Sequence, residues 1–132
     1  MVEGLDAPIG TPQWRYGYGT SYRDDFGFDE GPRAVPVVAG GRVYTFVAEG
    51  QRSVVDLATG TRIWSEDTTR RFGVRNGFFG AAGSPLVENG RVIVNVGGKD
   101  AGKDAGIIAT TRGIFTGFTD GRSTTRASAV WC

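Results

Sequence analysis

The stretch Val54 to Trp64, Val-Val-Asp-Leu-Ala-Thr-Gly-Thr-Arg-Ile-Trp, predicts a strand, a tight turn and a second strand. Its β-branched valines suit a half-buried pleated surface. Asp56 can fold its carboxylate back onto nearby backbone amides, Thr59 can support the same turn more weakly, and Gly60 adopts a positive φ without a steric penalty. Trp64 ends the stretch with a large apolar ring and one N–H group that needs an acceptor when it is buried.

The same pattern occurs earlier in the chain, from Gly4 to Trp14. Three fixed residues stand 50 positions apart in the two copies: Asp6, Gly10 and Trp14 in the first, and Asp56, Gly60 and Trp64 in the second. The segments before the next turns repeat as well, because Pro36 to Tyr44 resembles Pro85 to Ile93 at a spacing of 49. A period near 50 built from short strands is typical of a propeller and not of a helical solenoid.

The pattern Ala-x-Asp-x-x-Thr-Gly-x-x-x-Trp resembles the blade signature of pyrroloquinoline-quinone-like (PQQ-like) β-propeller repeats. The resemblance covers residues 1–108, with Gly4 and Val54 in the small-residue position and Ile9 replacing the first Thr. It implies an all-β fold, a partial β-propeller of four-stranded antiparallel blades. In that family the Trp of one blade docks onto the turn of a neighbouring blade, which implies packing roles for the signature residues. The implied blade-docking residues are Asp6, Gly10, Trp14, Asp56, Thr59, Gly60 and Trp64.

The chain length sets the expected domain organisation. A chain of 132 residues suffices for one small domain but is too short for a propeller of four or more complete blades. We therefore expect a fragment: the end of one blade at 1–16, a full blade at 34–66 and a partial blade at 83–108. The signature does not return after residue 108. Residues 109–132 are then either a divergent tail or the product of a reading-frame shift near Ala109.

Runs of β-formers between glycine-rich turns predict the individual strands. In the full blade they lie at about 34–39, 42–48, 52–57 and 61–66. In the next blade they lie at 84–87 and 91–96 around a strong Asn-Gly hairpin turn, and a further strand starts at 106–109. We expect no helix. Two long connections, 17–33 and 67–83, occupy the same place in the repeat, so we expect them side by side on one end of the propeller.

Composition excludes several classes of function. A net charge of +1 gives no electrostatic reason to expect a nucleic-acid partner. No stretch has the length of a membrane span, and the N-terminus lacks the plan of a secretion signal, although the family resemblance implies a periplasmic or secreted location. The absence of histidine removes the commonest general base and transition-metal ligand. We predict no catalytic residue and no metal site, and the single cysteine, Cys132, allows no internal disulfide.

The two long connections carry the candidate ligand-binding residues, because long loops on a rigid scaffold often hold function. Carboxylates of the first could bind calcium or work as an acid–base pair, but their spacing matches no defined calcium loop and pairing with adjacent arginines is favoured. Arginines of the second could bind an anionic ligand, but ion pairs with the first loop are favoured. The candidates are Arg23, Asp24, Asp25, Asp29, Glu30, Arg33, Arg70 and Arg75, with Arg71 beside them.

Aromatic residues in and beside these connections could stack on a flat ligand such as a quinone or a sugar. They could equally form a small satellite core that orders the long loops, which is the favoured interpretation. They are Tyr16, Tyr18, Tyr22, Phe26, Phe28, Phe72, Phe78 and Phe79.

Three functions remain open. The first is a non-catalytic binding or scaffold module, since the resemblance includes the lipoprotein scaffold of the bacterial outer-membrane insertion machine. The second is a fragment of a PQQ-dependent quinoprotein dehydrogenase, with PQQ and calcium bound only in the parent propeller; the adjacent cysteines of those enzymes are not found here. The third is a non-functional product of a truncated gene. Expected partners are other propeller blades or proteins, and open strand edges favour self-association.

Overall fold

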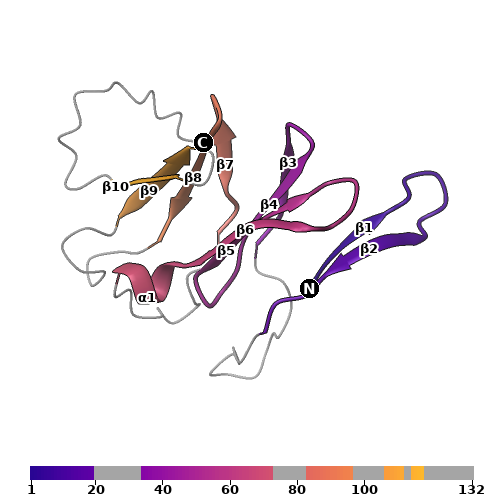
Figure 1. Cartoon of the computed structure of the whole chain (residues 1–132), viewed down its shortest axis with the longest axis horizontal. Helices are drawn as coiled ribbons and strands as arrows, with labels where there is room; N and C mark the ends of the chain where they lie inside the picture. The colour runs from indigo at the N-terminus through magenta and orange to yellow at the C-terminus, as the bar shows by residue number, and fades with distance from the viewer. Residues whose placement is uncertain (20–33, 73–82, 97–105, 112–113, 118–132) are drawn as a thin grey trace.

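The structure is a computed structural model that describes residues 1–19, 34–72, 83–96, 106–111 and 114–117. These ranges hold ten strands and one short helix. The strands form three antiparallel sheets that lie side by side in chain order (Figure 1). The prediction of an all-β fold built from four-stranded antiparallel blades is confirmed.

The first sheet is a hairpin of β1 (Val2–Leu5) and β2 (Pro12–Tyr16). Its turn closes through backbone bonds from the Asp6 amide to the Thr11 carbonyl (2.9 Å) and from the Gly10 amide to the Asp6 carbonyl (2.7 Å). Gly10 has a φ of 71°, which a side chain would disfavour.

The central sheet contains β3 (Val37–Ala39), β4 (Arg42–Phe46), β5 (Gln51–Asp56) and β6 (Arg62–Asp67) in consecutive antiparallel order. Each strand lies within three residues of its predicted bounds. Directly opposite residues share a face of the sheet, so Val43 and Val55 face one way while Phe46 and Arg52 face the other.

The third sheet has the order β10-β9-β8-β7. Its strands are β7 (Leu86–Glu88), β8 (Arg91–Asn95), β9 (Ile107–Thr111) and β10 (Ile114–Gly117). The predicted hairpin turn forms, with positive φ at Asn89 and Gly90. The sequence indicated only the start of a strand at 106–109, whereas β9 continues and pairs with β10, because both segments contain β-branched Ile and Thr. Residues 118–132, most of the expected tail, lie outside the described residues.

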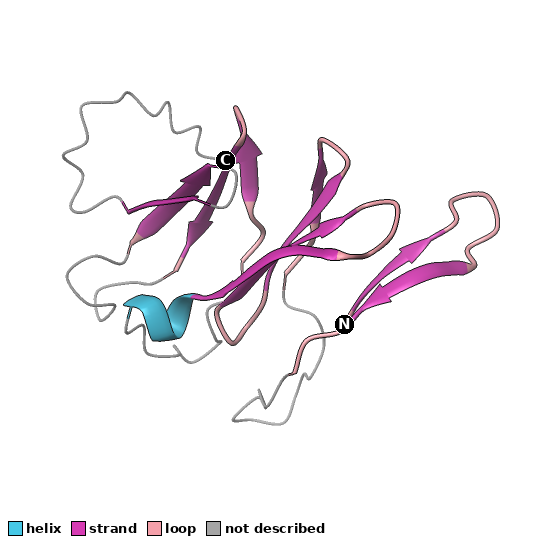
Figure 2. Ribbon diagram, viewed as in Figure 1, coloured by secondary structure: helices cyan, strands magenta, loops and turns pink. Residues whose placement is uncertain are grey.

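The expectation of no helix is wrong, because α1 (Thr68–Phe72) follows β6 directly (Figure 2). The Asp67 carboxylate caps this helix by accepting hydrogen bonds from the amides of Thr69 (3.0 Å) and Arg70 (3.1 Å). The buried Thr68 hydroxyl donates to the Gly50 carbonyl at 2.6 Å and ties the helix to the β4–β5 turn. A helix of five residues is too short to show a hydrophobic period in the sequence.

Two junctions join the three sheets. At the first junction, the β1–β2 hairpin packs on the central sheet through a core of Tyr16, Val43 and Val55, and the Tyr16 hydroxyl lies 3.1 Å from the Ser53 hydroxyl. At the second junction, the opposite face of the central sheet lies toward the third sheet (Figure 1). There the Val35 amide donates to the Ser84 hydroxyl at 3.2 Å, between neighbouring sheets.

Candidate functional site

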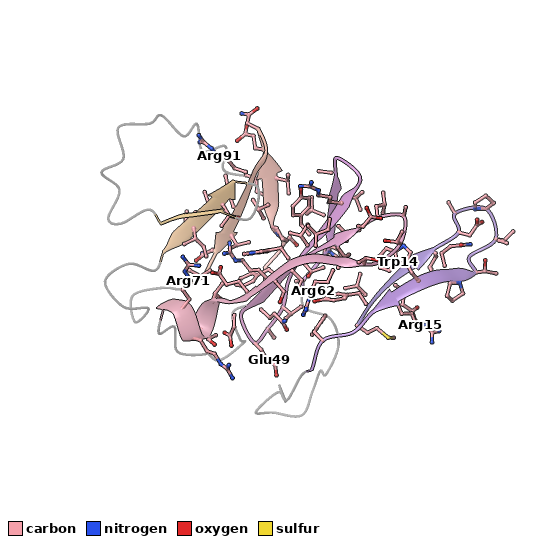
Figure 3. All side chains as sticks on the ribbon, viewed as in Figure 1. Trp14, Arg15, Glu49, Arg62, Arg71 and Arg91 are labelled. Atoms are coloured by element: carbon pink, nitrogen blue, oxygen red, sulfur yellow. The ribbon has the colours of Figure 1, made fainter. Side chains whose placement is uncertain are left out.

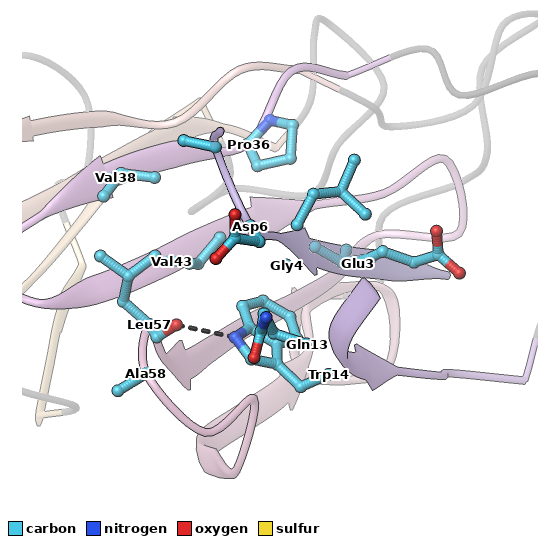
Figure 4. A pocket seen from close by; sticks show the side chains of 13 residues that line it. Glu3, Gly4, Asp6, Gln13, Trp14, Pro36, Val38, Val43, Leu57 and Ala58 are labelled. Atoms are coloured by element: carbon cyan, nitrogen blue, oxygen red, sulfur yellow. Dashed lines mark hydrogen bonds between the residues drawn. The ribbon is translucent and has the colours of Figure 1, made fainter. Parts of the chain in front are cut away.

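Trp14 lies at the centre of the first junction. Its indole N–H donates to the Leu57 carbonyl at 2.7 Å, across 43 residues of chain (Figure 4). The ring lies against two glycines, Gly4 of its own hairpin and Gly60 of the central sheet. A Cβ atom at Gly60 would come within 2.6 Å of the ring, so the absence of a side chain permits this packing. Arg15, the next residue in the strand, points to the outer side (Figure 3).

The turn that receives Trp14 is held by Asp56. One carboxylate oxygen accepts hydrogen bonds from the amides of Ala58 (3.0 Å) and Thr59 (2.9 Å) and from the Thr59 hydroxyl (3.1 Å). The bonds from Thr59 lower the pKa of Asp56 below its ordinary value, and the positive charge of Arg42 contributes less. Gly60 closes the turn with a φ of 68°.

The corresponding turn of the first hairpin has the same backbone closure but fewer side-chain bonds. The Asp6 carboxylate accepts one hydrogen bond, from the Ile9 amide at 3.3 Å. Ile9 stands at the position of Thr59 and has no hydroxyl to donate. The two copies of the signature therefore form the same turn with different side-chain support.

The second junction contains a buried charge. Arg52 is 2% exposed and forms an ion pair with Glu66, which also pairs with Arg71. The Arg52 guanidinium lies over the Trp64 ring, 5.0 Å from its centroid, a cation–π geometry. Among the residues that the structure describes, the Nε and Nη1 atoms of Arg52 have no hydrogen-bond partner. Burial lowers the pKa of Arg52 against the opposing effect of Glu66.

Sequence reasoning did not single out Arg52. The available signal is its place in an alternating strand, where Arg52 shares a face with Val54 and so points inward. Trp64 is the counterpart of Trp14 in the repeat, and in the part of the chain that the structure describes its indole N–H has no acceptor. Arg52 covers its ring instead.

The two described arginines of the second connection form ion pairs with carboxylates a few residues away in the sequence. Arg70 lies 3.2 Å from the Asp67 carboxylate, and Arg71 pairs with Glu66. The hydroxyl of Thr69 is the main cause of a lowered pKa at Asp67. The remaining loop candidates lie outside the described residues: Arg23, Asp24, Asp25, Asp29, Glu30, Arg33 and Arg75.

The aromatic candidates are partly described. Tyr16 and Tyr18 have ring centroids 6.2 Å apart, and Tyr18 packs against the core of the first junction. Burial, followed by the negative charge of Glu49, raises the pKa of Tyr18. Nothing is described for the side chain of Phe72. The other five candidates lie outside the described residues: Tyr22, Phe26, Phe28, Phe78 and Phe79.

A cleft of about 560 Å³ lies between the first hairpin and strands β3 and β4 of the central sheet (Figure 4). Its carboxylates are already engaged, Glu3 with Arg15 at 2.6 Å and Asp6 with its own turn. No group of three or more His, Cys, Asp or Glu side chains that could hold a metal occurs within the described ranges. The residues that line the cleft do not fit a calcium-bound quinone.

Within the described part of the chain, no helix is long and apolar enough to cross a membrane.

A family described as outer membrane protein assembly factor BamB matches residues 1–113. The chain belongs to the PQQ-like β-propeller repeat family. This PQQ-like chain is 32% identical over 103 residues to quinohemoprotein alcohol dehydrogenase ADH-IIG of Pseudomonas putida, covering 77% of the chain and 14% of that enzyme. It resembles the solved structure of quinohemoprotein alcohol dehydrogenase from Comamonas testosteroni with a TM-score of 0.60 and 26% identity, covering 87% of the chain and 17% of that enzyme.

The PQQ-like chain therefore spans less than a fifth of the length of either dehydrogenase. It resembles a propeller region of these enzymes, and its three sheets follow one another in chain order (Figure 1).

Proposed function

We propose that this chain acts as a non-catalytic segment of a PQQ-like propeller, a scaffold whose work is to dock one blade on the next. One observation carries the proposal: the Trp14 indole donates to the Leu57 carbonyl and packs on Gly60 of the neighbouring sheet. This contact joins two blades through residues of the repeat signature itself.

The division into blades follows from the same repeat. Residues 1–16 correspond to the last two strands of a blade, 34–66 to a full blade, and the segment from 83 onward to the next blade. The chemistry of the signature residues agrees with docking, since Asp56 and Gly60 build the turn that Trp14 contacts. Other blades or proteins are the partners that such a segment would bind.

A second candidate is a segment of a PQQ-dependent dehydrogenase, which the 32% identity to a quinohemoprotein alcohol dehydrogenase favours. In that case PQQ and calcium are bound by the parent propeller, and this chain forms a structural part of it without contributing catalytic residues. The two candidates share the docking role and differ in whether the assembled propeller oxidises an alcohol.

Two measurements on the full chain test the proposal. For docking, hydrogen exchange of the β2 amides should be slow in the wild type and faster in Gly60→Ala. Gly90→Ala should leave it unchanged, because Gly90 also has a positive φ and no neighbour within 4 Å but lies in the β7–β8 turn. For catalysis, PQQ and Ca²⁺ are added and cofactor absorbance and dye-linked alcohol oxidation are followed, and we expect neither uptake nor turnover. Equal exchange in all three proteins contradicts docking, and stoichiometric PQQ uptake with turnover favours the dehydrogenase.

A further inference from the structure

The hairpin turns at the same place in the central and third sheets differ at one of their two central residues. Gly40 and Gly41 join β3 to β4, whereas Asn89 and Gly90 join β7 to β8. All four residues have a positive φ, with 56° at Gly40 and 49° at Asn89. Two consecutive positive φ values are typical of a type I′ turn, for which Asn-Gly is a preferred pair. Asn89 is the one residue other than glycine with a positive φ in the part of the chain that the structure describes.

The Gly90 amide and the Asn89 side chain are both without hydrogen bonds to any described residue. By contrast, the amides of Gly10 and Gly60 in the two signature turns each donate to an aspartate carbonyl, at 2.7 Å and 2.9 Å. A Cβ atom at Gly90 would meet nothing within 4 Å, and Asn89 is exposed. The covalent chain of the turn therefore brings together an accessible carboxamide and an accessible backbone nitrogen.

These two groups can react with each other, and asparagine is among the least heat-stable residues. The Gly90 nitrogen loses its proton and attacks Cγ of Asn89. An N–Cγ bond forms, the Cγ–Nδ2 bond breaks and ammonia leaves, which yields a cyclic imide. Water then opens the imide at either carbonyl and gives aspartate or isoaspartate. Glycine favours the attack because it places no side chain beside the attacking nitrogen.

The attack requires the turn to open. A type I′ turn directs the Gly90 nitrogen away from the Asn89 side chain, so the backbone must rotate about the Cα–C bond of Asn89. Little opposes this opening, because β7 has three residues and lies at the edge of its sheet. Asn95 differs, since it lies in β8, which is paired on both sides, and its neighbour Val96 is 1% exposed and donates its amide to the Gly106 carbonyl at 3.0 Å.

We propose that Asn89 is a site of spontaneous deamidation, and that its isoaspartate product loosens β7 from the third sheet. Isoaspartate carries the main chain through its side-chain carbon, so it lengthens a loop whose length fixes the register of β7 on β8. Ser84, just before β7, accepts the hydrogen bond from the Val35 amide at the second junction, so loosening β7 also weakens that junction. Aspartate is compatible with a type I′ turn and leaves β7 in place.

The test is ageing of the full chain at mildly alkaline pH, followed by peptide mapping with mass spectrometry. We expect loss of the Asn89 carboxamide while Asn95 keeps its own. Isoaspartate is detected by methyl transfer from S-adenosylmethionine with an isoaspartyl methyltransferase. Fragment spectra separate Asn89 from Asn76, which is also followed by glycine and lies outside the described residues. Hydrogen exchange in the β7–β8 ladder should become faster in the aged protein, and exchange of β2 should stay slow.

Asn89→Gly is the matched control, because it reproduces the Gly40-Gly41 turn and removes the carboxamide. The aged variant should form no isoaspartate at this position and should keep the β7–β8 exchange of the fresh protein. An intact Asn89 after ageing, conversion to aspartate alone, or equal loosening of β7 in the aged variant would each overturn the inference. Faster exchange of β2 to the same degree as β7 would indicate general unfolding and would overturn it as well.

Discussion

The first junction closes around a ring packed on glycine, whereas the second closes around a buried ion cluster. Trp14 and Trp64 are counterparts in the repeat, but Trp14 donates to a carbonyl of the next sheet while Trp64 is covered by Arg52 of its own sheet. The difference lies in what faces each ring. The turn from Asp56 to Gly60 offers an acceptor and a flat surface, and the described part of the third sheet has no such turn. The contacts of Trp14 therefore depend on the turn that faces it as well as on the ring itself.

The largest effect should come from breaking the ion cluster of the second junction. Glu66→Ala leaves the Arg52 charge buried without its carboxylate and should lower the free energy of unfolding by about 3–5 kcal/mol. Arg52→Met removes the charge with similar volume and should be neutral or stabilising. Urea unfolding compares the two variants. Equal destabilisation by both would show that packing, and not an uncompensated charge, governs this junction.

Filling the glycine at the first junction should have the next largest effect. Gly60→Ala combines a positive φ with a clash against Trp14, and we expect a loss of about 2–4 kcal/mol. Gly10→Ala is the matched control, since Gly10 also has a positive φ but no neighbour within 4 Å, and should cost about 1–2 kcal/mol. Denaturant unfolding measures the difference. Identical losses would mean that Trp14 moves away at no cost.

The indole hydrogen bond can be separated from ring packing. Trp14→Phe removes the donor to Leu57 and should cost about 1 kcal/mol more than Trp64→Phe, because the Trp64 N–H has no acceptor among the described residues. The comparison uses the same substitution at counterpart positions, so the stability lost with the smaller ring is similar in both variants and largely cancels in their difference. A larger loss at Trp64, measured by unfolding, would assign the main packing role to the second junction.

Exchanging the turn residues should have a smaller effect. Ile9→Thr supplies a hydroxyl where Thr59 has one, and should stabilise the first hairpin by about 0.5–1 kcal/mol. Thr59→Ile should destabilise the central turn by a similar amount. Thermal unfolding of the two variants and of the double exchange tests whether the turns are interchangeable. Destabilisation by Ile9→Thr would show that the Ile9 side chain stabilises the folded hairpin even though it is 73% exposed.

Acid should weaken the Asp56 turn and the Asp67 cap by the smallest amount, because water screens both sites. Hydrogen bonds lower the pKa of each carboxyl in the folded state, so the stability they contribute is complete above the unfolded pKa of about 3.9 and is lost as pH falls through the folded values. Unfolding measured at stepped pH should show this decline, and Asp67→Asn should reduce it. Stability that rises on acidification below pH 4 contradicts the assignment.

The strands and turns could be predicted because their determinants are local. Alternating β-branched residues mark β4 and β5, and the Asn89-Gly90 pair marks the β7–β8 turn. The helix α1 could not be predicted in this way. Its stability depends on the Asp67 cap and on the hydrogen bond from the Thr68 hydroxyl to the carbonyl of Gly50, a residue 18 positions earlier.

The junctions were harder to predict than the strands. Repeat spacing indicated a docking role for Trp14, but the choice of Leu57 as acceptor depends on the position of a separate sheet. The burial of Arg52 depends on register, since one step along the ladder would remove Glu66 from the opposite position. The cleft is lined by residues of two separate sheets, so it becomes visible only when the strands are assembled.

The separation of Trp14 from Leu57 has a consequence for synthesis. The β1–β2 hairpin closes through local contacts, which form within microseconds, whereas the bond to Leu57 must wait for 43 further residues. A growing chain adds roughly 5–20 residues per second, so the hairpin spends seconds with its apolar face in water before the receiving turn exists. The hairpin made first is thus completed by a turn made later, and during that interval its apolar face is exposed to other chains.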